Sequence, residues 1–281
     1  MRKIPFKQVV DEVAAICMKA AYDLPEDVLN SIKECLEKED SERAKKFLRQ
    51  YLANADIASK ERVPLCQDTG FAVYFVEMGE MVEIEGGSIY AAIEAGTAKG
   101  YKEGYLRKSI VSDPIFGRKN TGDNTPPIVH LQLVEGEKLN VIIAPKGGGS
   151  ENMSQIKMLK PSDGRQGVIN TVVDAVVNAG GNPCPPTIVG VGVGGTFEKA
   201  AFLAKHALLR EVGSVNEDEN YAAMEKEILE KINASDVGPQ GLGGKTTALA
   251  VHIEYFPCHI ASLPVAVNLN CHAARHAGFE I

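Results

Sequence analysis

The sequence lacks long apolar runs. Nowhere do the roughly eighteen apolar residues of a membrane-spanning helix stand together. Near the N-terminus, Lys7, Asp11 and Glu12 interrupt any apolar core of a signal peptide. Internal repeats and low-complexity stretches are also missing, which excludes a solenoid. We therefore expect a cytoplasmic protein with no membrane partner.

An excess of positive charge is missing as well. The 281 residues carry 30 basic and 37 acidic side chains, a formal net charge of −7. This balance gives no net attraction to nucleic acid or to an anionic membrane, so we expect neither as a partner. A small anionic substrate would then need its own arginines. With 44% hydrophobic residues and no shift in composition, the chain is expected to form a single domain over residues 1–281.

Closely spaced cysteine pairs, the hallmark of many zinc and ferredoxin-type sites, are absent. Three of the six cysteines nevertheless stand in breaks rich in glycine, proline or asparagine: Cys66 in PLCQDTG, Cys184 in GGNPCPPT and Cys271 in NLNCHAARH. Such settings expose a thiolate at the end of an element, and reduced cysteines of an intracellular protein favour metal or catalytic roles over disulfides. We interpret them as three ligands of one metal centre. Burial as small hydrophobic residues is the alternative.

Three thiolates leave one metal position open. An iron–sulfur cluster held in this way keeps one iron for substrate, where it can act as a Lewis acid, so we expect a lyase. The other three cysteines are predicted to be structural. Cys17 and Cys35 each share an apolar helical stripe, and Cys258 has apolar neighbours in YFPCHIA.

Hydrophobic periodicity predicts an α+β fold. The first 60 residues are expected to be mainly helical, and Pro25 with the acidic residues after it marks the start of the second helix. The segments 129–135 and 139–145 are expected to pair as an antiparallel hairpin. Because helices and strands mix without regular βαβ alternation, the sheet should be antiparallel or mixed and packed with helices. Further strands are expected at 71–78, 187–194, 246–256 and 260–270, and helices near 6–22, from about 25, after Ser41, and at 88–101, 165–178, 196–210 and 217–233.

Two glycine-rich segments look like nucleotide sites but fail on spacing. GVGVGG (190–195) lacks the third glycine of the dinucleotide fingerprint at the required position. GPQGLGGKTT (238–247) has Pro239 where a phosphate loop needs glycine, and it follows an expected helix instead of a strand. We therefore reject an ATPase and expect these glycines to permit close packing and tight turns. N–H groups in the run 147–149 could form a nest that binds carboxylates.

Several polar residues are candidates for handling protons and carboxylates. Asp68 lies two residues after the first of the three exposed cysteines and could exchange protons with substrate, or cap an Asx turn before Thr-Gly. His259 is either a catalyst or a satisfied structural histidine. Arg107 and Arg118 are candidate carboxylate forks, since guanidinium binds such groups bidentately. His252 alternates with apolar neighbours on its strand and is expected to face solvent.

Six motifs follow one another along the chain: PLCQDTG, GYLRKSIVSDP, GDNTPPIVH, PKGGGSEN, NPCPPTIVGVGVGG and NLNCHAARH. Together they resemble the α subunit of the two-subunit class I fumarate hydratases, and the closely similar α subunit of tartrate dehydratase shares the pattern. The resemblance implies that Cys66, Cys184 and Cys271 hold a [4Fe-4S] cluster whose unique iron binds the substrate carboxylate and hydroxyl.

The same resemblance implies roles for five further residues. Gln67, Arg107 and Gly149 match positions that contact the dicarboxylate substrate. Asp68 and His259 match a proposed acid pair.

The activity implied by the resemblance is that of a hydro-lyase, the reversible hydration of fumarate to malate. Loss of water from tartrate or another hydroxy-dicarboxylate is the alternative. A metal is chemically sensible here, because removing a proton beside a carboxylate builds negative charge that a Lewis acid can take up. Single-chain members of the family that this sequence resembles have a further C-terminal portion that completes the active site, whereas this sequence stops soon after Cys271. The resemblance therefore implies that a separate β subunit supplies the base and further carboxylate-binding groups.

A structural zinc protein or binding subunit is a distant alternative from another class. Its ligands would be Cys258, His259, Cys271 and either His272 or His276. This interpretation leaves the other two exposed cysteines without a role. Adjacent residues at 258 and 259 would also strain to face one ion.

Overall fold

A computed structural model describes residues 1–281, and its internal contacts divide the chain into two compact units. Unit 1 comprises 1–24, 55–148 and 275–281, and unit 2 comprises 25–54 and 149–274. The single domain over 1–281 stays a prediction, because a division by contacts does not test whether either unit folds alone.

The N-terminal region is helical, as predicted. It contains α1 (Phe6–Tyr22), α2 (Glu26–Lys38) and α3 (Glu42–Glu61), and the boundary between the units falls within α3. Pro25 is the N-cap of α2, and two acidic residues follow it in the first turn, where they interact favourably with the positive end of the helix dipole.

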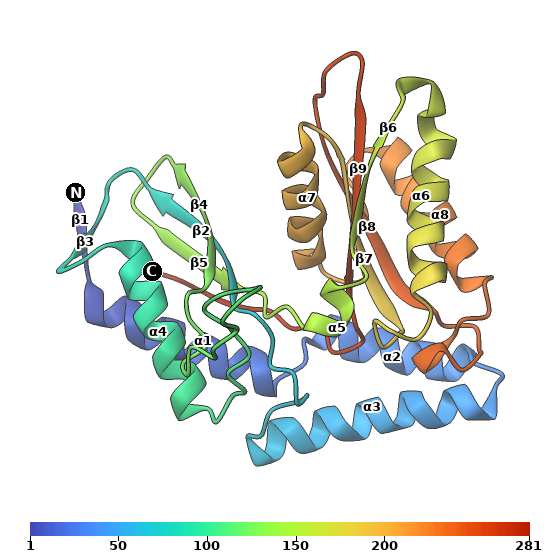
Figure 1. The fold of residues 1–281 in the computed structure, drawn as a ribbon. Coiled ribbons are helices and arrows are strands. Elements are labelled where there is room, and N and C mark those ends of the chain that lie inside the picture. Colours follow the sequence, from blue (N-terminus) through green and yellow to red (C-terminus); the bar gives the residue numbers. More distant parts are fainter. The chain divides into compact units, whose positions relative to one another are not determined.

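Unit 1 contains a four-stranded sheet in the order β10–β5–β2–β4, with α1 and α4 (Ile89–Glu103) packed against each other beside it (Figure 1). Its strands are β2 (Val73–Gly79), β4 (Ile128–Val134), β5 (Leu139–Ile143) and β10 (Ala277–Glu280). A separate parallel pair joins β1 (Arg2–Pro5) to β3 (Val82–Glu85).

The predicted hairpin of 129–135 with 139–145 is wrong. Both strands form, but β2 lies between them, parallel to β4 and antiparallel to β5. The reason is burial. The first four residues of β2 are all buried, so this strand occupies the centre of the sheet with a partner on either side, whereas no residue of β4 is fully buried and it forms the edge.

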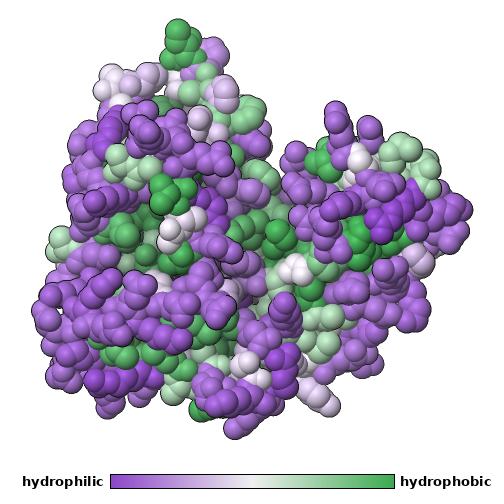
Figure 2. All heavy atoms as spheres, turned by 180° about the vertical axis from the view of Figure 1, so that it is seen from behind, coloured by the Kyte–Doolittle hydropathy of each residue, from purple (hydrophilic) through white to green (hydrophobic).

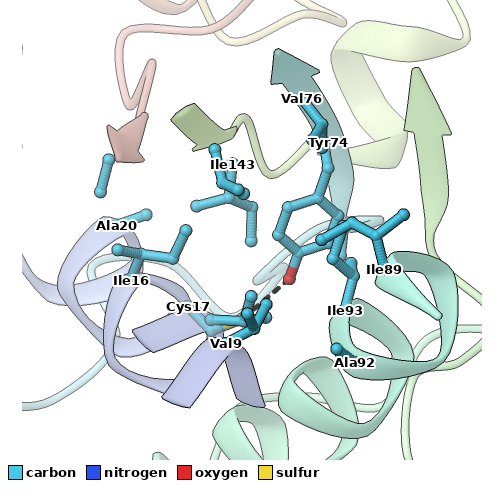
Figure 3. Packing of buried hydrophobic residues seen from close by; sticks show 14 of the residues in the cluster. Val9, Ile16, Cys17, Ala20, Tyr74, Val76, Ile89, Ala92, Ile93 and Ile143 are labelled. Carbon is cyan, nitrogen blue, oxygen red and sulfur yellow. Dashed lines mark hydrogen bonds between the residues drawn. The ribbon is translucent and has the colours of Figure 1, made fainter. Parts of the chain in front are cut away.

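The core of unit 1 is built around Tyr74 of β2, which points from the sheet toward α1 and α4 (Figure 3). Its hydroxyl lies 3.1 Å from the Cys17 sulfur and 2.8 Å from the Thr97 hydroxyl. Burial raises the pKa of the Cys17 thiol to about 12. Cys17 is therefore a core residue, as predicted, and is inert as a ligand or nucleophile.

Unit 2 contains a second four-stranded sheet, in the order β6–β9–β7–β8. In Figure 1, α7 covers one face of this sheet, and α6 and α8 cover the other. The short helix α5 (Gly148–Glu151) begins at the boundary between the units. The other elements are β6 (Gln155–Leu159), α6 (Gly164–Ala179), β7 (Thr187–Gly194), α7 (Phe197–His206), α8 (Glu219–Asn233), β8 (Ala248–Phe256) and β9 (Leu263–Asn270). Together the two units confirm the α+β class.

The glycines of β7 bring this strand into direct backbone contact with α7. A Cβ atom at Gly190 would collide with the Ala204 carbonyl oxygen, and one at Gly192 with the Ala200 carbonyl oxygen. Close packing, and not nucleotide binding, thus accounts for this glycine motif. The second motif follows α8 and is not preceded by a strand, which agrees with the rejection of a phosphate loop.

His252 of β8 is buried, so the prediction that it faces solvent is wrong. Its side chain is 1% exposed because α-helical and 3-10 segments cover both faces of the sheet, even at an edge strand. Burial, reinforced by the Arg210 charge, lowers the pKa of His252 to about 4, although Glu225 and Asp27 oppose this. The imidazole is therefore neutral in the folded protein near neutral pH.

This buried imidazole should make stability fall with pH below about 6.5. The unfolded chain binds a proton at His252 near the ordinary value of 6.5, whereas the folded chain binds one only near pH 4. The contribution of His252 to stability is therefore constant above pH 6.5 and becomes unfavourable as the pH falls toward 4, by about 3 kcal/mol in total. Denaturant unfolding at pH 7 and pH 5 should show this slope, and H252M should flatten it.

The surface is mostly hydrophilic on the face drawn in Figure 2, with smaller hydrophobic patches between the polar side chains. None of the helices combines the length and the apolar character that crossing a membrane would require.

Candidate active site

Cys66 and Asp68 lie in the turn that leads into β2 of unit 1. The Gly70 N–H donates to the Asp68 Oδ1 over 3.0 Å, which is the Asx turn expected from the sequence. The Gly148 N–H also donates to the other carboxylate oxygen, Oδ2, over 2.7 Å. Both oxygens of Asp68 are thus held by backbone donors, so the carboxylate has a fixed direction.

A cavity of about 260 Å³ opens beside this carboxylate. Arg107 and Lys146 contribute the cationic side chains of its wall, and the exposed Ser109 adds a hydroxyl-bearing residue. Arg107 is exposed, whereas Lys146 is only 6% exposed. The structure therefore brings two predicted residues, Asp68 and Arg107, to one cavity whose charges suit a small anion.

Lys146 was not among the residues singled out from the sequence. Its backbone forms a bridge with Phe71, with each N–H donating to the other carbonyl over 2.9 Å, and this pairing brings it to the Asp68 turn. The available signal was its place directly before the three-glycine run. The sequence predicts a nest of N–H groups in that run, which the bond from Gly148 supports, but it assigns no role to the lysine.

Cys184 and Cys271 lie together at one end of the unit 2 sheet. Cys184 comes just before β7 and Cys271 just after β9, and these antiparallel strands pair Ile188 with Asn270. The backbone N–H of His272 and its Nδ1 both approach the Cys184 carbonyl oxygen, at 3.3 and 3.0 Å. The carbonyl accepts, so Nδ1 carries the proton.

Cys184 is held in an unusual backbone conformation, with φ of 54°. Only a few per cent of non-glycine residues adopt this left-handed region, and such residues gather at functional sites. Its thiol is exposed, and its N–H donates to the Gly181 carbonyl oxygen over 3.0 Å. The turn therefore presents the thiol outward at a conformational cost.

Tyr51 of α3 marks the shared neighbourhood of the two thiols. Its ring stacks on His272 with 3.8 Å between centroids, and its hydroxyl donates to the Pro185 carbonyl oxygen over 3.3 Å. Burial raises the pKa of Tyr51 to about 12, and the Cys184 and Cys271 thiols add to the shift. Both cysteines thus lie close enough to one hydroxyl to influence its pKa.

Gly149 and Gln67 are accessible in their own units. Gly149 is exposed in α5, and a Cβ atom there would lie 3.5 Å from the carbonyl oxygen of Asn182, in the turn that carries Cys184. Gln67 is exposed beside Cys66 in unit 1. Both positions leave room for a ligand.

His259 and Cys258 occupy the opposite end of the unit 2 sheet. They lie in the loop between β8 and β9, and both are exposed. Eight-residue β9 separates this loop from Cys271, a span of about 25 Å at ~3.3 Å per residue. The structure thus does not group His259 with Cys184 and Cys271.

This separation also removes the zinc alternative. Cys258 and His259 lie at one end of β9, and Cys271 and His272 lie at the other. A single ion cannot bind ligands from both ends of the strand. The prediction that Cys258 is structural is also wrong as far as burial is concerned, because Pro257 and the residues after it leave the sheet and carry the thiol into solvent.

The three predicted cluster ligands fit a metal by their chemistry. Cys66 and Cys271 are partly exposed and Cys184 is exposed, unlike the buried Cys17. None of the six cysteines is in a disulfide. No group of three or more His, Cys, Asp or Glu side chains is assembled within the structure, and Cys66 belongs to unit 1 while the other two belong to unit 2.

Arg275 is a second residue that sequence reasoning missed. Its guanidinium is buried, 4% exposed, and its Nη2 donates to the Asp68 carbonyl oxygen over 2.9 Å. Nε and Nη1 have no hydrogen-bond partner. A buried, under-satisfied cation behind the Asp68 turn raises the positive potential near the cavity.

An α+β chain with exposed thiols in glycine- and proline-rich turns, and with an anion-sized cavity beside a fixed carboxylate, has the parts of a hydro-lyase subunit. The chain belongs to the fumarate hydratase (fumerase) family, whose model matches residues 10–280. It is 44% identical over 276 residues to a Methanocaldococcus jannaschii protein given the provisional name L(+)-tartrate dehydratase subunit alpha, with 96% of each chain covered. It is also 31% identical over 279 residues to the L(+)-tartrate dehydratase subunit alpha of Escherichia coli strain UTI89, covering 98% of this chain and 91% of that one.

Proposed function

We propose that this chain is the α subunit of a hydro-lyase that removes water from a 2-hydroxydicarboxylate, with L(+)-tartrate as the preferred substrate. The observation that supports this proposal is the cavity, in which the fixed carboxylate of Asp68 lies beside the cationic Arg107 and Lys146. The relatives' names favour tartrate over the fumarate expected first from the sequence. Reversible hydration of fumarate to malate is the second candidate, supported by the family itself.

The cofactor of the proposal is a [4Fe-4S] cluster held by Cys66, Cys184 and Cys271. When bound, it supplies a Lewis acid at its open iron. The left-handed, exposed turn at Cys184 and the common neighbourhood of Cys184 and Cys271 support this assignment.

The chain's own residues bind the dicarboxylate and move its proton. Arg107 binds one carboxylate, with Gln67 and Gly149 contacting the substrate from their own turns. Asp68 exchanges a proton with the substrate, and the N–H groups of Gly70 and Gly148 hold its carboxylate in place. For His259, a role in proton transfer rests on the resemblance alone. Its loop lies at the other end of the sheet from Cys271, so the geometry within unit 2 adds no support.

The reaction with tartrate has a simple balance. One carbon loses a proton and its neighbour loses hydroxide, so water leaves and an enol of a 2-oxodicarboxylate remains, which then tautomerises to the ketone. The cationic side chains hold the two carboxylates while charge builds beside one of them. We place the enzyme in the cytoplasm, with a β subunit supplying the base that this chain lacks.

A substrate panel tests the proposal. The chain is reconstituted anaerobically with its β subunit and offered L(+)-tartrate, malate and fumarate, with product formation followed by ultraviolet absorbance. We expect kcat/KM for tartrate to exceed that for malate or fumarate by at least about tenfold, since a site that binds a second hydroxyl penalises its loss. The reverse order would make fumarate hydratase the function, and no turnover of any of the three would contradict a hydro-lyase.

Arg107 should be the dominant carboxylate-binding residue on this chain. Replacing it by methionine in the reconstituted enzyme should raise KM by about 10- to 100-fold, because a charge-assisted hydrogen bond contributes about 1.5–3 kcal/mol. Arg118 provides the matched control. It is exposed, its Nη1 donates to the Pro114 carbonyl oxygen, and it does not line the cavity, so R118M should leave KM unchanged. If both variants changed KM equally, the cavity would not be the site that binds the substrate carboxylate.

A further inference from the structure

The motif GDNTPPIVH contributes a buried amide that lies behind the cavity and bonds to the backbone of the segments that line it. Asn124 is 0% exposed and adopts a left-handed backbone conformation with φ of 66°. Asparagine tolerates this conformation better than most side chains, although glycine does so at least cost. A polar side chain that is fully buried in such a conformation is expected to be held there by specific hydrogen bonds.

The Asn124 side chain bridges the two segments that form the cavity. Its Nδ2 donates to the Gly70 carbonyl oxygen over 3.2 Å, and its Oδ1 accepts from the Ser109 N–H over 2.7 Å. The first contact lies two residues after Asp68, and the second lies two residues after Arg107. One amide therefore spans from the carboxylate turn to the arginine segment.

The bridge is reinforced on either side. The Thr69 hydroxyl donates to the Arg107 carbonyl oxygen over 3.1 Å, which links the same two segments directly. Asp123 holds the segment that carries Asn124, because its Oδ1 accepts from the Thr125 N–H at 3.0 Å and from the Thr125 hydroxyl at 2.7 Å. The amide is thus presented from a turn that is fixed independently of the cavity.

We infer that Asn124 is a positioning residue that sets the separation of Asp68 and Arg107 across the cavity. This inference rests on the proposed function, in which Asp68 handles a proton while Arg107 holds a carboxylate of the same substrate. Those roles require a fixed distance between the two groups, and a displacement of about 1 Å can cost on the order of a hundredfold in rate. Asn124 touches neither group and acts only through the backbone next to each.

Glycine is the right probe at this position. N124G keeps the left-handed backbone favourable and removes both side-chain bonds, whereas alanine would add backbone strain. We expect N124G in the reconstituted enzyme to lower kcat/KM by about 10- to 100-fold, with kcat falling and KM rising together, because both groups lose their alignment. Iron and sulfide content should stay at the wild-type level.

N124D separates the halves of the bridge. It keeps an acceptor for the Ser109 N–H but replaces the donor toward the Gly70 carbonyl oxygen by a second acceptor. We expect it to resemble N124G at neutral pH. Wild-type kinetics for N124D would show that the contact with Gly70 does not determine the separation of Asp68 and Arg107, and would overturn the inference.

Asn120 supplies the matched control in the same loop. Its side chain also makes two bonds to backbone, donating to the Lys108 carbonyl oxygen at 2.9 Å and accepting from the Gly122 N–H at 2.8 Å, but it is exposed and does not reach the Asp68 turn. N120G should change kcat/KM by less than about threefold, because it leaves the bridge to the Asp68 turn intact. A loss as large as that of N124G would mean general loosening of the loop and would contradict positioning by Asn124.

The experiment also separates this inference from the proposed function. If the wild-type enzyme turns over none of the three dicarboxylates, or R107M leaves KM unchanged, the proposed function fails. If wild type is active and R107M raises KM, but N124G leaves both kcat and KM unchanged, only the positioning role fails. Hydrogen exchange of the Ser109 amide, expected to be faster in N124G, shows independently that the bridge has been broken.

Discussion

Single replacement of Cys66, Cys184 or Cys271 by serine should give a folded protein that binds no complete cluster. Wild type reconstituted anaerobically should hold about four iron and four sulfide per chain, and each variant close to none. Loss of the Lewis acid removes several kcal/mol of transition-state stabilisation, so kcat should fall by at least about a thousandfold. Metal and acid-labile sulfide analysis together with steady-state kinetics measure both effects.

Cys258→Ser is the matched control for this set. Its thiol is exposed in the same unit as Cys184 and Cys271, but at the other end of β9. The variant should keep full iron, sulfide and activity. Wild-type cluster content in any of the three ligand variants would remove that cysteine from the site, and zinc without sulfide in the wild-type protein would overturn the cofactor assignment.

The chain purified without its β subunit should be nearly inactive even when the cluster is loaded. Relatives over nearly the full length of this chain are named as alpha subunits, and the candidate cavity contains one carboxylate, Asp68, for which we propose proton exchange, but no assigned base. Loss of a positioned proton-transfer group typically costs about 10²- to 10⁴-fold, so we expect a rate at least a hundredfold below that of the complex.

Titrating the β subunit into a fixed amount of the cluster-loaded chain measures this directly. Activity should rise and saturate as the complex forms, with iron content unchanged throughout. Full activity of the isolated chain, with no change on addition of the β subunit, would show that the active site is complete without a partner.

Local sequence patterns predicted the elements well but predicted their pairing poorly. Apolar periodicity identified the long helices and most strands, because those signals are written within one segment. The segments 129–135 and 139–145 look like a hairpin locally, yet β2, whose first four residues are buried, takes the place between them. Burial of β2 on both faces is a property of the whole sheet, which no short segment encodes.

The candidate site shows the same division. Cysteines in glycine- and proline-rich breaks, and Asp68 before Thr-Gly, stood out because their neighbours have unusual composition. Lys146, Asn124 and Arg275 did not, since each reaches the Asp68 turn from a distant segment through a backbone bridge or a single hydrogen bond. Contacts of this kind become visible only when the segments are placed in space.

The contact between β7 and α7 has a mechanical consequence for the turn that carries Cys184. Gly190 and Gly192 leave no side chain between strand and helix, so there is no compressible layer to absorb a small movement of either. We therefore expect strand and helix to move together. Cys184 stands three residues before the strand begins, so the turn that carries its thiol is anchored at one end to a stiffly packed strand–helix pair.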